Sequence, residues 1–509
     1  MIARLSFLTH LDTRESLPGA FSWVGVSRMV SGPPIDWIPD LVAECWRELQ
    51  HGSLWRVAYN DLRFLSRGDS EILGQKGIEW RDLARDSRGL TPQPLKDVFV
   101  DCQKMRDESR RATDLFRLLV ALDRAAAGLR PTNATYHPDI RELVKRWKDK
   151  GNLAADSTLM VLPRAANGFR GGATLNQCLE NYVVLDRGDY DVQFHHLDEH
   201  GDFSGLRASS IRVAFVPVLE NDSDARFVPG RNGIGFSVAL DHQRQAQLAG
   251  DMDGLVEKME NDGVNIALLP ENCAATDVLE ALRSALHNNF ARRARRPSLR
   301  LLIVGVGSNG SPEIGRVFND VCVLSGEGKL ICRQTKLHPW HLDSLQVQRY
   351  GLTAKEVSAV EDIELEKPPT LHLLEDPLLG RLLILICEDF ARIDTARDFA
   401  VRIGPSLVIG PVMDDSLEER SWAFSAANNL ARSEPGALVL VANSCWLSRL
   451  AGPRGRLNNS ARKKERGPGV GLVHDGRAAT IFRFSPSGER RFVSRNVDVT
   501  RALAPMRRM

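Results

Sequence analysis

The chain has 509 residues, more than one hydrophobic core usually serves, so two domains are expected. Hydrophobic residues make up 43% and charged residues 26%, the composition of an ordinary globular protein. The 67 lysines and arginines nearly cancel the 65 aspartates and glutamates, which excludes a strong overall field that would attract nucleic acid or a membrane surface.

The termini and the cysteines argue against export and against a metal site. The N-terminal stretch has no long apolar segment followed by a cleavage site, and no apolar run is long enough to cross a bilayer. The eight cysteines are spread along the chain without a C-x-x-C pair or a zinc-type spacing. We therefore expect a cytoplasmic protein with reduced cysteines, no metal and no membrane partner.

Residues 1–208 are expected to form a mainly helical accessory domain of unknown role. Apolar residues recur at helical spacing over 38–49, 95–129 and 139–148. This part of the sequence contains no repeat, no low-complexity tract and no evident catalytic signature.

Residues 209–500 change to alternating strands and helices, and residues 501–509 form a C-terminal tail. Apolar strands are predicted over residues 211–218, 264–270, 301–306, 320–324, 330–334, 382–387, 406–409, 437–443, 479–484 and 491–497. Helices are predicted over residues 243–259, 277–294 and 421–433. This alternation predicts an α/β layered domain with a largely buried sheet.

Three residues that can carry chemistry stand where predicted strands end. Glu271 ends the run Ala-Leu-Leu-Pro-Glu, Lys336 follows Leu-Ile-Cys-Arg-Gln-Thr, and Cys387 ends Leu-Leu-Ile-Leu-Ile-Cys. Open α/β folds build their sites at strand ends, where the sheet holds side chains rigidly. Taken singly, a core cysteine, a solvated lysine and a helix-capping glutamate are the more frequent interpretations.

Together these residues resemble the signature of the nitrilase, or carbon–nitrogen hydrolase, superfamily. The resemblance runs over about residues 209–500, and its motifs are Pro270-Glu271, Asn319-Asp320, Lys336-Leu337-His338, Ile386-Cys387-Glu388-Asp389, Ala442-Asn443 and the Asp475-Gly476 turn. The Cys-Glu-Asp triplet is closer to the glutamine amidases of glutamine-dependent NAD synthetases than to the Cys-Trp-Glu of true nitrilases.

The resemblance implies a four-layer α-β-β-α sandwich that often forms a homodimer and needs no metal or organic cofactor. Cys387 would attack an amide-type carbon, with Glu271 as general base and Lys336 favouring the thiolate. Lys336 and the backbone N–H of Glu388 would hold the oxyanion. The implied activity is hydrolysis of a non-peptide C–N bond in a small amide-type substrate through a thioester on Cys387.

The sequence departs from the resembled pattern after the lysine. The family carries a second glutamate shortly after it, whereas none follows Lys336 before Glu356. Asp343 and Gln346 are the candidates for this place, although a glutamine cannot stabilise a charged lysine.

Three residues that flank the strand ends are candidates for the pocket wall. They are Trp340, Asn443 and Trp446. Ordinary packing explains their positions equally well.

Two other functions stay open from the sequence. The domain could be a binding or regulatory module without turnover. Nitrilase-like domains occur attached to reverse transcriptases in bacterial anti-phage systems, although this chain has no Tyr-x-Asp-Asp polymerase motif. It could also be an N-acyltransferase, in which an amine resolves the thioester.

Three weaker signals favour ordinary structure. G-x-G-x-x-G at 305–310 is followed by Ser311-Pro312, which predicts a loop and not a dinucleotide site. A polar stretch with His195, His196, Asp198 and His200 favours a surface turn over a metal site. The basic segment 454–466 could contact a protein or nucleic acid, but a disordered loop is the more frequent origin of such a run.

Overall fold

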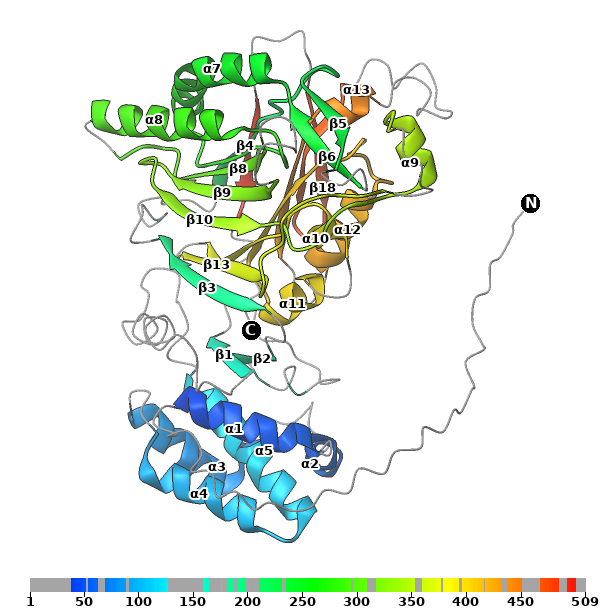
Figure 1. Ribbon diagram of the computed structural model, residues 1–509. Helices are drawn as coiled ribbons and strands as arrows, with labels where there is room; N and C mark the ends of the chain where they lie inside the picture. Colours follow the sequence, from blue (N-terminus) through cyan, green and yellow to red (C-terminus); the bar gives the residue numbers. More distant parts are fainter. Residues whose placement is uncertain are drawn as a thin grey trace.

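The fold is that of a computed structural model (Figure 1). The structure describes residues 38–51, 54–62, 69–87, 91–126, 159–163, 175, 179, 181–186, 190–197, 203, 210–230, 235–293, 296–308, 317–352, 359–376, 379–392, 396–415, 417–432, 437–450, 467–484 and 492–499. The predicted helix at 139–148, the basic segment 454–466 and the tail 501–509 lie outside the described residues.

The described part of the N-terminal domain consists of helices that pack around α5. The helices are α1 (Ile38–Gln50), α2 (Leu54–Leu62), α3 (Asp69–Asp86), α4 (Gln93–Lys104) and α5 (Glu108–Ala125). The sequence predicts one helix over 95–129, but the chain forms two, because Asp107 caps the start of α5. Its carboxylate accepts a hydrogen bond from the Arg110 N–H at 3.1 Å.

Two mixed β-sheets form the frame of the second domain. The first has the strand order β10-β9-β8-β7-β4-β19 and consists of β4 (Ser210–Phe215), β7 (Ile266–Leu268), β8 (Leu301–Gly307), β9 (Asn319–Ser325), β10 (Leu330–Thr335) and β19 (Val493–Asp498). The second has the order β18-β17-β16-β15-β14-β13-β3 and consists of β3 (Asp191–His196), β13 (Thr370–Asp376), β14 (Gly380–Ile384), β15 (Leu407–Val412), β16 (Leu438–Asn443), β17 (Gly469–His474) and β18 (Ala479–Arg483). The central strands β4-β7-β8 and β14-β15-β16 pair in parallel.

The two sheets stack face to face over a shared apolar core. This core takes Phe215 and Ile266 from the first sheet and Ile409 and Phe482 from the second. The rings of Phe215 and Phe482 stack with their centroids 5.2 Å apart. A Cβ at Gly471 of β17 would lie 2.3 Å from the Phe215 ring, so glycine at this position permits the close approach of the sheets.

Helices cover the outer face of each sheet (Figure 1). α7 (His242–Asn261) and α8 (Thr276–Arg292) pack on the six-stranded sheet, while α11 (Ala396–Ile403) and α12 (Trp422–Arg432) pack on the seven-stranded sheet. The layers are therefore helix, sheet, sheet and helix, which confirms the predicted α-β-β-α sandwich.

Short elements complete the second domain and carry several of its loops. They are β5 (Ala225–Pro229), β6 (Phe236–Leu240), β11 (His341–Leu342), α9 (Ser344–Arg349), β12 (Ala359–Val360), α10 (Glu388–Ala391) and α13 (Trp446–Leu450). An aromatic cluster of Phe227, Phe236, Trp340 and Tyr350 joins β5 and β6 to the segment around α9.

A two-stranded sheet, β1 (Leu159–Pro163) with β2 (Tyr182–Asp186), lies between the two domains (Figure 1). Successive side chains of a strand point to opposite faces, and here each face serves a different core. Val161 packs with the N-terminal helices, whereas Met160 and Leu162 pack with the core of α11 and α12. The two domains are therefore joined by apolar contacts on both sides of this small sheet.

The predicted domain boundary at residue 208 cuts through the sandwich. β3 precedes that boundary, yet it is an edge strand of the seven-stranded sheet and pairs in parallel with β13. His195 and His196 thus lie in a strand and not in the predicted surface turn. Val192 and Phe194 alternate with polar residues in β3 and pack on the same core, so the strand signal is present in the sequence but the prediction did not use it. Asp198 and His200 lie outside the described residues.

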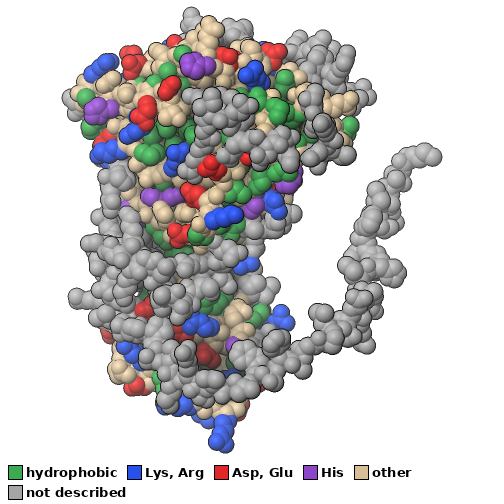
Figure 2. Space-filling view, in the orientation of Figure 1, with side chains coloured by type: hydrophobic (Ala, Val, Ile, Leu, Met, Phe, Trp, Pro, Cys, Tyr) green, Lys and Arg blue, Asp and Glu red, His purple; other side chains and the backbone are tan. Residues whose placement is uncertain are grey.

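Neither sign of charge dominates the face of the molecule that Figure 2 shows. Figure 2 shows basic and acidic side chains interspersed on the visible face, in line with the near-balance of charge in the sequence. Among the described helices, none combines the length and the apolar character that a membrane crossing needs.

Candidate active site

Glu271 follows the end of β7, and its loop lies tightly against β8. A Cβ at Gly305 would come within 2.0 Å of the Pro270 carbonyl oxygen, and one at Gly307 within 1.4 Å of the Asn272 side chain. These two glycines belong to β8 and not to the predicted loop. Their function is to let the loop that carries Glu271 approach the sheet.

Lys336 follows β10 and reaches into a buried pair of carboxylates. Its Nζ lies 2.8 Å from Glu271 Oε1 and 2.7 Å from Glu361 Oε2. The Asn319 side-chain amide donates to both carboxylates at 2.8 Å, and the Trp340 N–H donates to Glu361 at 2.9 Å. Lys336 is 1% exposed and Glu271 2% exposed, so the ion pairs form away from solvent.

Cys387 stands at the turn from β14 to α10 in a sparsely populated backbone conformation. Its φ is 44° and its ψ −99°, which costs on the order of 1–3 kcal/mol and is typical of functional turns. Glu271 and Lys336 are the charged groups that act on the Cys387 thiol, which places all three side chains close together. The structure thus brings Glu271, Lys336 and Cys387 together.

Asp389 ties the lysine loop to the cysteine loop. Its buried carboxylate accepts the Leu337 N–H at 3.0 Å and the His338 N–H at 2.8 Å, and it contacts His338 Nδ1 at 2.8 Å. The Lys-Leu-His and Cys-Glu-Asp motifs are therefore one structural unit. The Cys-Glu-Asp triplet is recognisable in the sequence, but the structural role of Asp389 is visible only in the fold.

Burial and neighbouring charges set the protonation of the three groups. Burial raises the pKa of Glu271, and Glu361 adds to the rise while Lys336 opposes it. Burial acts to lower the pKa of Lys336, but the two carboxylates outweigh it and the pKa lies well above its ordinary value. Burial, then Glu271, raises the pKa of Cys387 more than Lys336 lowers it. The resting site therefore holds a neutral thiol, a charged lysine and a carboxylate suited to accept a proton.

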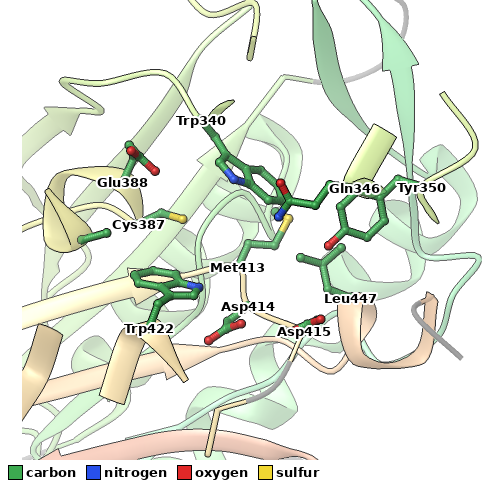
Figure 3. A pocket seen from close by; sticks show the side chains of 11 residues that line it. Trp340, Gln346, Tyr350, Cys387, Glu388, Met413, Asp414, Asp415, Trp422 and Leu447 are labelled. Carbon is green, nitrogen blue, oxygen red and sulfur yellow. The ribbon is translucent and has the colours of Figure 1, made fainter. Parts of the chain in front are cut away.

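A cavity of about 190 Å³ opens beside Cys387 (Figure 3). Figure 3 shows the sulfur directed into the space between Trp340, Met413 and Trp422. Tyr350, Asp414 and Asp415 form further parts of the wall. A cavity of about 150 Å³ holds benzene, so this one has room for a small molecule or the end of a larger one.

Neither Asp343 nor Gln346 takes the place of the second acid. Asp343 caps α9: its carboxylate accepts the Gln346 N–H at 2.8 Å, and the Gln346 side chain accepts the Asp343 N–H at 3.0 Å. The second carboxylate on Lys336 belongs to Glu361, 25 residues after the lysine. The chain between them forms α9 and returns through the β11–β12 pair, a detour that spacing alone does not reveal. The feature of the sequence that could have pointed to Glu361 is the apolar pair Ala359-Val360, a short strand that ends directly before this glutamate.

Of the three predicted wall residues, Trp340 lines the cavity, whereas Asn443 and Trp446 do not. Asn443 shapes the wall from behind, since its side chain accepts the Asp414 N–H at 2.9 Å and donates to the Asp414 carbonyl at 3.0 Å. Trp446 is fully buried, and its indole N–H donates to two backbone carbonyls beside β5. Glu388 lies at the cavity and begins α10.

Comparisons with known proteins show a similarity of fold alone. No protein-family model matches the chain, and no curated protein matches it. One similar solved structure is an amidase from Nesterenkonia sp., with 16% sequence identity and a TM-score of 0.34; the match covers 58% of this chain and 92% of the amidase. Another is a carbon–nitrogen hydrolase from Helicobacter pylori G27, with 11% identity and a TM-score of 0.34; the match covers 58% of this chain and 91% of the hydrolase. A glutamine-dependent NAD(+) synthetase from Cytophaga hutchinsonii is also similar, with 14% identity and a TM-score of 0.31; the match covers 57% of this chain and 43% of the synthetase. The chain resembles the nitrilase superfamily in fold, and at these scores the likeness supports no argument about its chemistry.

Replacing Lys336 with methionine is expected to lower the free energy of unfolding by about 3–5 kcal/mol, because Glu271 and Glu361 would lose their shared cation in a buried place. One carboxyl would then have a folded-state pKa above its unfolded value. The loss should therefore be largest at neutral pH and shrink as the pH falls. Urea unfolding at neutral and mildly acidic pH measures both effects.

Lys329→Met is the matched control, since this turn lysine pairs with Glu327 at 2.8 Å while its side chain is 61% exposed. Its replacement should change the free energy of unfolding by less than about 0.5–1 kcal/mol. Equal losses from the two lysines would contradict the structural role of the buried cluster.

Proposed function

We propose that the chain is a thiol-dependent hydrolase of a non-peptide carbon–nitrogen bond in a small amide-type substrate. The observation that carries this proposal is that Glu271, which Lys336 binds at 2.8 Å, is also the charged group that acts most strongly on the Cys387 thiol. A nucleophile close to a carboxylate base, beside a cation and a small cavity, is the arrangement that acyl transfer through a thioester needs.

Acylation would begin with attack of the Cys387 sulfur on the amide carbon while Glu271 takes the thiol proton. Lys336 has one N–H left for the resulting oxyanion, since two of its three donors serve Glu271 and Glu361. The Glu388 N–H supplies a second donor, because the first N–H groups of a helix have no partner inside it. Collapse of the intermediate breaks the C–N bond, and the leaving amine takes the proton from Glu271.

Deacylation would use the same carboxylate. Glu271 takes a proton from water as the water oxygen attacks the thioester carbon, and the oxyanion again faces Lys336 and the Glu388 N–H. Collapse breaks the C–S bond, releases a carboxylic acid and returns the proton to the Cys387 sulfur. One water is consumed, and the amide becomes an acid and an amine. Glu361 and Asn319 act as positioning residues, because they contact Lys336 and Glu271 and not the reacting carbon.

The charge of the cavity wall favours a neutral or positively charged substrate over one that carries a carboxylate. Asp414 and Asp415 line the cavity, and no lysine or arginine is among the described residues that do so. Arg349 contacts Asp415 at 3.1 Å and offsets part of this charge from outside the wall. The aromatic rings of the wall can face an ammonium or guanidinium group, which adds to the preference.

Two alternatives are separated from hydrolysis by the products. An N-acyltransferase shares every step up to the thioester and then forms a substituted amide in place of an acid. A regulatory module without turnover would keep the fold but would leave Cys387 with ordinary reactivity.

Cys387→Ala is expected to abolish the release of ammonia and carboxylic acid from a panel of primary amides, because the variant has no nucleophile. In the unaltered chain, a haloacetamide should label Cys387 faster than any other described cysteine, since only this thiol has a base and a cavity beside it. Peptide mass spectrometry and an ammonia assay measure the two effects.

Cys445→Ala is the matched control, a buried cysteine beside the same inter-sheet core, and it should keep both labelling and turnover. The hydrolase proposal is contradicted if Cys387 is labelled no faster than Cys445 and no amide is turned over. That result would favour the regulatory module. Turnover that appears only with an added amine would favour the acyltransferase.

The acid limb of kcat/KM against pH is expected above the ordinary glutamate pKa of about 4.3. Burial raises the pKa of Glu271, and only the ionised carboxylate can take the thiol proton, so activity is lost as the pH falls through that raised value. Asn319→Ala removes a hydrogen bond to the charged form and should move the limb to higher pH. A limb in the ordinary range that Asn319→Ala leaves unchanged would argue against Glu271 as the base.

Among amides of matched length, kcat/KM should be highest for a substrate with an ammonium tail, lower for a neutral tail and lowest for a carboxylate tail. Asp414→Asn removes one wall charge and should reduce the preference for ammonium over carboxylate by roughly tenfold, equivalent to about 1.4 kcal/mol. Glu419→Gln, an exposed carboxylate outside the cavity, is the control and should leave the ratio unchanged. If the carboxylate-tailed amide is the best substrate, the inference about charge fails while the hydrolase proposal stands.

A further inference from the structure

Three side chains that can bind a metal ion meet between the two sheets, away from the cavity beside Cys387. They are His195 on β3, His372 on β13 and Cys332 on β10, and one ligand atom of each lies within 4.8 Å of the others. His195 Nε2 and His372 Nδ1 are 2.8 Å apart. Figure 1 shows that β10 lies next to β13 and β3, so the cluster joins one sheet to the other.

The strands around the cluster are fastened to each other. β10 and β3 are edge strands of their sheets, and β13 pairs with β3. Gln334 connects β10 to β13 through its side chain. The side-chain amide donates to the Thr370 carbonyl at 2.8 Å, and the side-chain oxygen accepts the backbone N–H of His372 at 3.0 Å. A rigid backbone on both sides is the support that a metal site requires.

An irregularity in β10 turns Cys332 towards the histidines. The register of β10 against β9 shifts between Leu330 and Cys332. Ile331 and Cys332 both belong to the core between the sheets, although neighbours in a regular strand face opposite sides. A bulge that redirects a side chain is a frequent feature of functional positions.

The donors fit a borderline-soft divalent ion such as Zn²⁺. Two imidazole nitrogens and one thiolate are zinc ligands, and Zn–N and Zn–S bonds of about 2.1 and 2.3 Å in a tetrahedron place the ligand atoms roughly 3.3–3.6 Å apart. Side-chain shifts of about 1 Å would bring the three atoms to that geometry. Cys332 is 5% and His372 8% exposed, while the half-buried His195 leaves a path for entry.

The surrounding charges are compatible with a cation. An imidazole binds a metal ion through the lone pair of its neutral form. The carboxylates of Glu366 and Asp191 lie close enough to the His372 ring to act on it electrostatically, which places negative charge near the cluster. That charge would balance the single positive charge of Zn²⁺ bound by one thiolate and two neutral imidazoles.

We propose that His195, His372 and Cys332 form a zinc site that clamps the edge strands of the two sheets. The ion replaces the thiol proton of Cys332, which passes to solvent, and the ring proton between the two histidines moves to the other nitrogen of its ring. Water or a further ligand completes the tetrahedron. The argument for this site does not rest on the proposed hydrolase function.

Metal binding by the purified full-length chain tests the proposal. After loading with Zn²⁺ and gel filtration, elemental analysis should find about one zinc per chain. The Co²⁺-substituted chain should show a thiolate-to-cobalt charge-transfer band. Cys332→Ala and His372→Ala should each weaken Zn²⁺ binding by more than roughly 100-fold, since even a residue that only supports a ligand is worth 10–100-fold.

Cys322→Ala is the matched control, because Cys322 is a buried cysteine of the neighbouring strand β9 whose side chain packs on the outer face of the sheet. Zn²⁺ should raise the Tm of the unaltered chain and of Cys322→Ala, but not that of Cys332→Ala. Equal zinc content in the two cysteine variants overturns the proposal. If Cys332→Ala fails to fold, the Co²⁺ spectrum of the unaltered chain decides, and the absence of the charge-transfer band overturns it.

Discussion

The buried cluster around Lys336 is the constraint on which the rest of the site depends. An ammonium group that is 1% exposed is stable only with compensation, and here Glu271 and Glu361 provide it. Two carboxylates for one cation leave an excess of negative charge, and with burial this raises the pKa of Glu271. One interaction therefore fixes the positions of the proposed general base and the proposed oxyanion donor together, and the exclusion of water strengthens both.

Several backbone contacts hold this cluster in place without entering it. Asp389 binds the two N–H groups after Lys336, so the lysine and cysteine loops move as one. Gly305 lets the Glu271 loop lie against β8. The unusual φ of Cys387 is maintained because its N–H donates to the Pro411 carbonyl and its carbonyl accepts the Phe390 N–H. The backbone conformation of Cys387 is thus held by β15 on one side and by α10 on the other.

The sequence predicts the layered fold and the Glu-Lys-Cys trio, because each of these residues ends a strand whose apolar run is visible by itself. It does not predict Glu361, since that carboxylate reaches Lys336 only through the β11–β12 pair, a tertiary feature. β3 is missed although Val192 and Phe194 alternate with polar residues, because its place in the sandwich comes from pairing with β13, which the local pattern does not show. The His195–His372 contact spans 177 residues, so rules based on the local spacing of metal ligands cannot detect it.

The two sites share one strand, and this relates them physically. Cys332 lies within β10 and Lys336 directly follows its end. Among the described strands of its sheet, β10 pairs with β9 alone, and the Gln334 bonds to β13 fasten its other side. Misplacement of a reacting group by about 1 Å can cost 100-fold in rate. In the proposed zinc-bound state, the clamp at Cys332 would therefore act on catalysis by fixing the strand that delivers the Lys336 ammonium, without contact with the substrate.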